Sequence, residues 1–206
     1  MNLDNEEFLI VNGELRKYKK DEESVIIPEG VTKIGNSAFK EKKIKHVTIP
    51  NTVTEIGDFC FAKSNLSEIL IPESVVKIGD FAFSENKLKY VWFQEGVKVI
   101  GEFAFFHNEI SQLVLAQTTE SIGKSAFNMN KIKNLIIPES VKVIKENAFS
   151  INDIGTIIFS KGIEKIETEA FKLNKIENCI FEDDTNVSVE KKAFDEGVKR
   201  FTKIKK

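Results

Sequence analysis

The stretch Leu66–Phe83, with the sequence LSEILIPESVVKIGDFAF, contains the repeated pattern that determines the fold of this chain. The same order of apolar, proline, glycine and phenylalanine positions recurs 22 residues before it and 22 residues after it. A fixed period of this kind is the signature of a repeat protein, in which each copy packs against its neighbours. The 206 residues therefore predict a stack of similar coils.

Each unit contributes seven apolar positions, enough to fill the interior of one coil. The period-two alternation of Val47-Thr48-Ile49 predicts a short strand whose flanking side chains point inward. Stacking would align these strands into a parallel sheet, with one strand per repeat. The phenylalanine that closes each unit is expected to stack inside as a continuous column, which consists of Phe39, Phe61, Phe83, Phe105, Phe127, Phe149 and Phe171.

Composition and charge narrow the functional class. Hydrophobic residues make up 41% of the chain. Thirty basic and 32 acidic residues are interspersed, with a net charge of −2, so nucleic acid is not expected as a partner. No segment approaches the roughly 20 apolar residues of a membrane helix, so no membrane insertion is expected. The N-terminal MNLDNEEF is acidic where a secretory signal peptide would be basic, which predicts a cytoplasmic or already processed chain.

The L-x-x-L-x-L segment, the proline after it and the V-x-x-I-G-x-x-A-F ending together resemble the BspA-like bacterial subclass of leucine-rich repeats. The resemblance covers about residues 22–204, in seven to eight copies. It implies a β-rich, right-handed solenoid with a parallel sheet on its concave side and short helical or 3-10 turns on its convex side. It also implies a cell-surface or secreted location and a role in adhesion and protein binding.

Both ends differ from the regular repeats of residues 22–182, and we expect a single leucine-rich repeat domain over residues 1–206. Asn12-Gly13 predicts a tight β-hairpin within residues 1–21, where a cap for the first coil is favoured over a docking edge. Residues 183–206 contain one extra residue and place Lys203 in an inward column, which predicts an irregular last repeat and a polar C-terminal cap.

Two further columns have structural and functional interpretations. The asparagine column is expected to bond turn backbone and not a ligand; it consists of Asn86, Asn108, Asn130, Asn152 and Asn174. The glycine of the Ile-Gly pair is replaced by Lys145 and Glu167 in later repeats. Because neither residue readily adopts a positive φ, the turn is expected to relax there.

A column of phenylalanines and a column of acids complete the outer side. Phe59, Phe81 and Phe103 are expected to thicken the core, with an apolar patch on the convex side as the alternative. The acidic column is interpreted as solvated turn residues and not as a cation site; it consists of Asp58, Asp80 and Glu102.

Few residues could carry chemistry. Cys60 and Cys179 lie five repeats apart, ~25 Å at ~4.8 Å per strand, which is too far for a disulfide. They are interpreted as buried small hydrophobes. His46 and His107 fall on different columns, so neither a metal site nor a nucleophile–base pair is indicated. We expect no catalytic residues, no metal and no cofactor.

The outward side chains of the strands are the candidate ligand-binding residues. An apolar stripe about eight strands long is expected on the concave sheet, beside a polar row that includes Tyr90. The predicted binding residues are Leu70, Tyr90, Trp92, Val114, Ile136, Ile158 and Ile180. The β-branched members suit exposed strands in any case, whereas Trp92 beside Tyr90 is typical of interaction surfaces.

The sequence therefore predicts a non-catalytic protein-binding module that uses this stripe, with the identity of its protein partner open. The alternative is a self-assembling structural or cytoplasmic scaffold protein that forms homo-oligomers through the same stripe.

Overall fold

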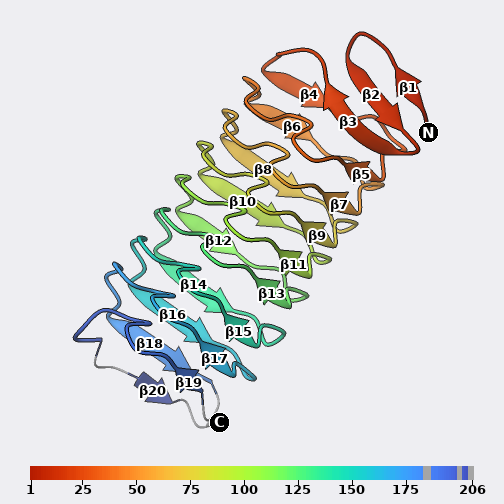
Figure 1. Ribbon diagram of the computed structural model, residues 1–206. Coiled ribbons are helices and arrows are strands. Elements are labelled where there is room, and N and C mark those ends of the chain that lie inside the picture. Colours follow the sequence, from red (N-terminus) through yellow and green to blue (C-terminus); the bar gives the residue numbers. More distant parts are fainter. Residues whose placement is uncertain (183–186, 199–200, 204–206) are drawn as a thin grey trace.

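The structure, a computed structural model, describes residues 1–182, 187–198 and 201–203. It is a β-solenoid of about eight stacked coils (Figure 1). One side, here called the long-strand face, carries the strands that the alternating segments predict. These strands are β4 (Ser24–Ile26), β6 (His46–Thr48), β8 (Glu68–Ile71), β10 (Tyr90–Phe93), β12 (Gln112–Val114), β14 (Asn134–Ile137), β16 (Thr156–Phe159), β18 (Asn178–Phe181) and β20 (Phe201–Lys203).

Each coil also has a second, two-residue strand, which the sequence pattern did not predict. These strands are β5 (Lys33–Ile34), β7 (Glu55–Ile56), β9 (Lys77–Ile78), β11 (Val99–Ile100), β13 (Ser121–Ile122), β15 (Val143–Ile144), β17 (Lys165–Ile166) and β19 (Ser188–Val189). With β1 (Leu3–Asp4), β2 (Phe8–Val11) and β3 (Glu14–Tyr18) they form one eleven-stranded sheet. Two residues are too few to show an alternation, so the V-x-x-I segment has no strand signal.

The phenylalanine column forms the centre of the core, as predicted. Its seven rings are fully buried, and neighbouring centroids lie 4.8 Å apart at Phe39–Phe61 and 5.1 Å apart at Phe83–Phe105. Parallel pairing keeps every column in register from coil to coil; Trp92, for example, lies opposite Leu70. The isoleucine, valine and leucine columns surround the rings and are almost completely buried.

The long-strand face is divided into three hydrogen-bonded groups. They are β4–β6, β8–β10–β12 and β14–β16–β18–β20. The eleven-stranded sheet on the other side runs continuously past both interruptions. The coils therefore lose their strand ladder on the long-strand face alone, between β6 and β8 and between β12 and β14.

The third side of each coil, here called the turn side, connects a short strand to the next long strand. The helical or 3-10 turns predicted for it are wrong, because the described residues contain no helix. Two residues per coil adopt the left-handed conformation, for example Phe81 (φ 55°) and Glu85 (φ 53°), and this interrupts any helical run. The backbone N–H groups bond to the following coil instead; Phe83 N–H donates to the carbonyl of Ala104 at 2.7 Å.

Lack of space explains the glycine column. None of its members from Gly35 to Gly123 has a positive φ. A Cβ on Gly79 would lie only 2.4 Å from Oδ1 and 2.7 Å from the backbone nitrogen of Asp58. The positive φ occurs two residues later and persists at Asn147 and Glu169, both at 57°, so the expected relaxation of the turn in the last repeats is wrong.

The N-terminal hairpin closes one end of the core. Asn12 and Gly13 form its turn with φ of 52° and 80°, as a two-residue type I′ connection requires. β2 and β3 are antiparallel, and β3 pairs in parallel with β5. Phe8 and Tyr18 extend the aromatic column, with centroid distances of 5.5 Å between them and 5.1 Å from Tyr18 to Phe39.

At the C-terminal end the predicted register change is confirmed. Lys165 pairs with Ser188, one residue beyond the 22-residue period, and Cys179 pairs with Phe201 in the normal period. Phe194 still stacks on the phenylalanine column. The side chain of Lys203 and the basic tail, on which the polar-cap prediction rests, lie outside the described residues.

Within each ladder, the parallel strands of the long-strand face and those of the eleven-stranded sheet have the same spacing of ~4.8 Å. Neither side is therefore forced to be longer than the other. In the view of Figure 1 the coils accordingly follow one another along a nearly straight line.

Candidate binding surface

The long-strand face presents the predicted stripe as an exposed apolar row. Because strand side chains alternate between the two faces, every second residue points away from the core. The exposed fractions are 51% for Leu70, 49% for Trp92, 74% for Val114 and 55% for Ile136. Ile158 and Ile180 are only half-buried, and Ile26 is exposed but is separated from Leu70 by Thr48. The binding role of these residues stays a prediction.

Strand β10 holds the aromatic centre of the row. The rings of Tyr90 and Trp92 are parallel within 16°, with centroids 5.7 Å apart. Trp92 lies between Leu70 and Val114 on the neighbouring strands. Tyr90, which is 40% exposed, lies in the adjacent polar row. Aromatic groups with one apolar and one polar end are well suited to interfaces.

A hollow of about 400 Å³ opens beside this row, where the ladder between β12 and β14 is interrupted. Val114 and Ile136 supply apolar lining, and Gln112 and Asn134 supply amide groups. The arrangement can receive a side chain with an apolar body and a polar end. Sequence reasoning missed the hollow, because no residue of the repeat pattern marks the interruption of the ladder.

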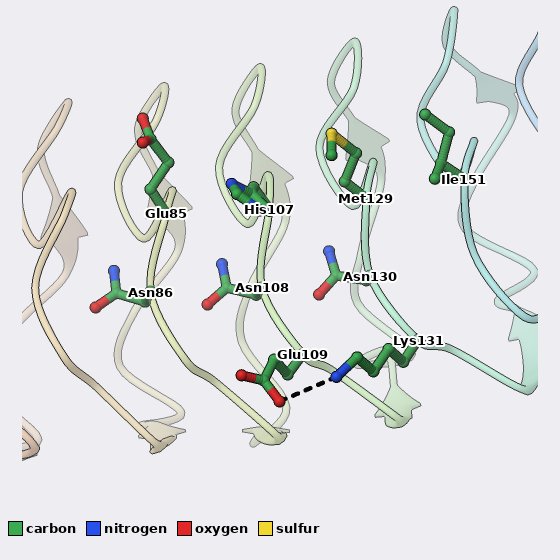
Figure 2. A pocket seen from close by; sticks show the side chains of 9 residues that line it. All are labelled: Glu85, Asn86, His107, Asn108, Glu109, Met129, Asn130, Lys131 and Ile151. Carbon is green, nitrogen blue, oxygen red and sulfur yellow. Dashed lines mark hydrogen bonds and ion pairs between the residues drawn. The ribbon is translucent and has the colours of Figure 1, made fainter.

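The asparagine column is used by the scaffold, as predicted. Oδ1 of Asn108 accepts a hydrogen bond from the N–H of Leu88 at 3.1 Å. Its Nδ2 donates to the carbonyls of Phe83 at 2.9 Å and Phe105 at 3.2 Å. Figure 2 shows Asn86, Asn108 and Asn130 side by side on successive coils. Because the amides bond to backbone on two coils, they are not available to a ligand.

A second hollow, of about 540 Å³, lies above these asparagines on the turn side (Figure 2). His107, Met129 and Ile151 line it at positions with positive φ. Below them, Lys131 donates to Glu109 at 3.1 Å and lowers the pKa of that carboxyl. Within the described residues, His107 has no hydrogen bond to another side chain.

The Phe59 column forms a separate ladder outside the buried core, so the expectation that it thickens the core is wrong. The ring centroids are 4.8 Å apart at Phe59–Phe81 and 4.7 Å apart at Phe81–Phe103. Phe59 is 39% exposed, and the other two are half-buried. All three have φ near 54°, which turns these side chains away from the interior. Lys40 covers Phe59 at one end, 5.5 Å from the ring centroid.

The other predicted features have structural roles. Asp58 Oδ1 accepts the backbone N–H of Asp80 at 2.9 Å, so the acidic column links neighbouring coils. Cys60 and Cys179 are free and buried, and burial raises the pKa of the Cys179 thiol to about 12. Among the described residues, no group of three or more histidine, cysteine, aspartate or glutamate side chains could hold a metal ion. In the same part of the chain, no helix is long and apolar enough to cross a membrane.

The chain belongs to the BspA-type leucine-rich repeat family. Six copies of the family's repeat region match, over residues 17–130 and 77–199. This confirms the resemblance that the 22-residue motif indicates. A search of curated proteins finds no match.

Three solved structures that this chain matches are bacterial proteins. The pneumococcal vaccine antigen PcpA is 18% identical over 84% of this chain, which spans 66% of that chain, with a TM-score of 0.40. A leucine-rich cell surface protein from Faecalibacterium prausnitzii is 18% identical, with coverage of 87% and 76% and a TM-score of 0.36. A leucine-rich repeat protein from Bacteroides ovatus is 16% identical, with coverage of 88% and 84% and a TM-score of 0.33.

Proposed function

We infer that the chain is a non-catalytic protein-binding module and that it binds its partner with the apolar stripe of the long-strand face. The observation that carries this is the contiguous exposed row from Leu70 through Trp92 and Val114 to Ile136. Contiguous apolar patches on soluble proteins mark interaction surfaces, and tryptophan and tyrosine dominate their energetics. Membership in a family of repeat proteins is consistent with this role.

We further propose that the chain has a surface or adhesion role in a bacterium. It rests on the BspA-type repeat alone. The stripe, not the repeat motif, would select the partner in that setting, because the motif residues are buried and the stripe residues face solvent.

The test is capture of partners from bacterial and host-cell lysates by the immobilised parent chain and by the Trp92→Asp variant. We expect Trp92→Asp to fold normally, because the side chain is half exposed, and to lose the captured proteins. Leu173→Asp is the matched control, since Leu173 is 58% exposed on the turn side. If Trp92→Asp recovers the same partners as the parent, the stripe is not the binding surface.

A further inference from the structure

The two edges of the long-strand face carry opposite charges in its central part. The residues that precede the strands include the exposed lysines Lys45, Lys89 and Lys133. The residues that follow the strands include the exposed glutamates Glu73, Glu95 and Glu139. The apolar stripe therefore runs between a basic edge and an acidic edge.

Most of these edge charges lack an ionic partner, unlike the charges elsewhere on the coils. On the other sides, lysines and acids of successive coils pair, as in Lys98–Glu120 at 3.2 Å and Lys124–Glu146 at 2.9 Å. Lys45 also pairs, with Glu23. Within the described residues, however, no ion pair forms at Lys89, Lys133 or Glu139.

The polarity of this face makes it complementary to itself in one orientation. A two-fold axis along the stripe brings each coil opposite the same coil of a second copy and reverses the two edges. On the coils of β10 and β14 the basic edge of each copy then covers the acidic edge of the other, whereas Lys45 meets Asn51 and Glu73 meets Ser67. Lys89 would face Glu95 across the interface, and Lys133 would face Glu139. An axis across the stripe would instead place lysines over lysines.

We propose that the long-strand face binds a second copy of this chain, in a parallel two-fold dimer with Trp92 near the axis. This deepens the proposed function, because it rests on the same stripe and names its partner. An apolar centre with a charged rim is the usual anatomy of an interface, and complementary rim charges select orientation more than they add affinity.

The dimensions of the face suffice for a stable dimer. The stripe is ~35 Å long at ~4.8 Å per strand, and the seven residues from Lys89 to Glu95, six steps of ~3.3 Å, span ~20 Å. Each copy would bury about 700 Å², or about 1,400 Å² in total, which lies in the range of stable protein interfaces. Because the coils follow one another along a nearly straight line (Figure 1), two copies can meet along the length of the face.

Sedimentation velocity of the purified chain over a wide range of micromolar concentrations tests the dimer. We expect a concentration-dependent shift to the mass of two chains. The pair Glu95→Lys and Glu139→Lys should weaken dimerisation by roughly tenfold or more, since it replaces rim attraction by repulsion. Adding Lys89→Glu and Lys133→Glu should restore it. Glu41→Lys with Glu85→Lys on the turn side is a control of equal charge and should change nothing.

Cysteine cross-linking tests the orientation. In the parallel dimer, two Leu70→Cys chains form a disulfide with each other at that position, and so do two Ile158→Cys chains. Cross-linking only between a Leu70→Cys chain and an Ile158→Cys chain would overturn the parallel arrangement. A chain that stays monomeric at all concentrations would overturn the dimer. In that case loss of lysate partners by Trp92→Asp would still support the protein-binding function, so the two proposals fail separately.

Discussion

The asparagine column and the apolar stripe follow the same 22-residue period, but their side chains do opposite things. Asn108 bonds the backbone of its own coil and of the previous one and is almost completely buried. Trp92, on β10 of the same coil, is half exposed and contacts the ring of Tyr90. A column whose polar groups are all hydrogen-bonded to the backbone supports the fold, whereas an exposed apolar column is available to a partner. Periodicity therefore indicates the fold, and only the direction of each side chain distinguishes function from scaffold.

The largest expected effect comes from truncating a buried aromatic ring, Phe105, in comparison with an exposed one, Trp92. Phe105→Ala should cost roughly 3–5 kcal/mol, because it leaves a cavity between the rings of Phe83 and Phe127. Trp92→Ala should change stability by no more than about 0.5 kcal/mol. Thermal and urea unfolding followed by circular dichroism would compare them. A Phe105→Ala variant that melts within about one degree of the parent would show that the column is not the core.

A smaller effect is expected from the polar column. Asn108→Ala should cost roughly 2–3 kcal/mol, since it leaves the buried N–H of Leu88 and the carbonyl of Phe83 without their partner. Asn134→Ala is the matched control, because Asn134 is exposed on the long-strand face. The same unfolding measurements apply. Equal destabilisation by the two substitutions would remove the distinction between a scaffold column and an exposed one.

The buried columns were predictable because each obeys the 22-residue period and stacks on itself. A phenylalanine or isoleucine that recurs once in every unit, such as Phe105, is predicted to be buried from this repetition alone. The hairpin was predictable for a local reason, since Asn12-Gly13 matches the positive φ values that its turn requires.

The turn side was not predictable in the same way. Phe59 and Phe61 are two residues apart, and neither a strand-like nor a helical period predicts which of the two is buried. The positive φ at Phe59 turns that ring outward, while Phe61 is fully buried. The backbone conformation there follows from hydrogen bonds to the next coil, which the local sequence does not contain. The interruption between β12 and β14 depends on coil-to-coil geometry for the same reason.

Charged side chains on the surface also differ in whether they bond to the scaffold. Away from the stripe, the carboxylate of Glu190 accepts hydrogen bonds from Lys165 Nζ at 2.7 Å and from the backbone N–H of Thr168 at 2.9 Å. These bonds lower the pKa of Glu190 to about 2. Glu139, at the edge of the stripe, has no ion pair within the described residues. Glu190, which binds one coil to the next, should therefore contribute to stability, whereas Glu139 should not.

The smallest predicted effect follows from this difference and depends on pH. Because the pKa of Glu190 is lower in the folded than in the unfolded chain, its contribution is complete above about pH 4.3 and is lost as the pH falls towards 2. The melting temperature of Glu190→Gln should therefore lie below that of the parent at pH 6, and the gap should close on acidification. Glu139→Gln, which removes no ion pair among the described residues, is the matched control. If the gap at Glu190 is the same at pH 6 and pH 2, its ion pair does not hold the last coils together.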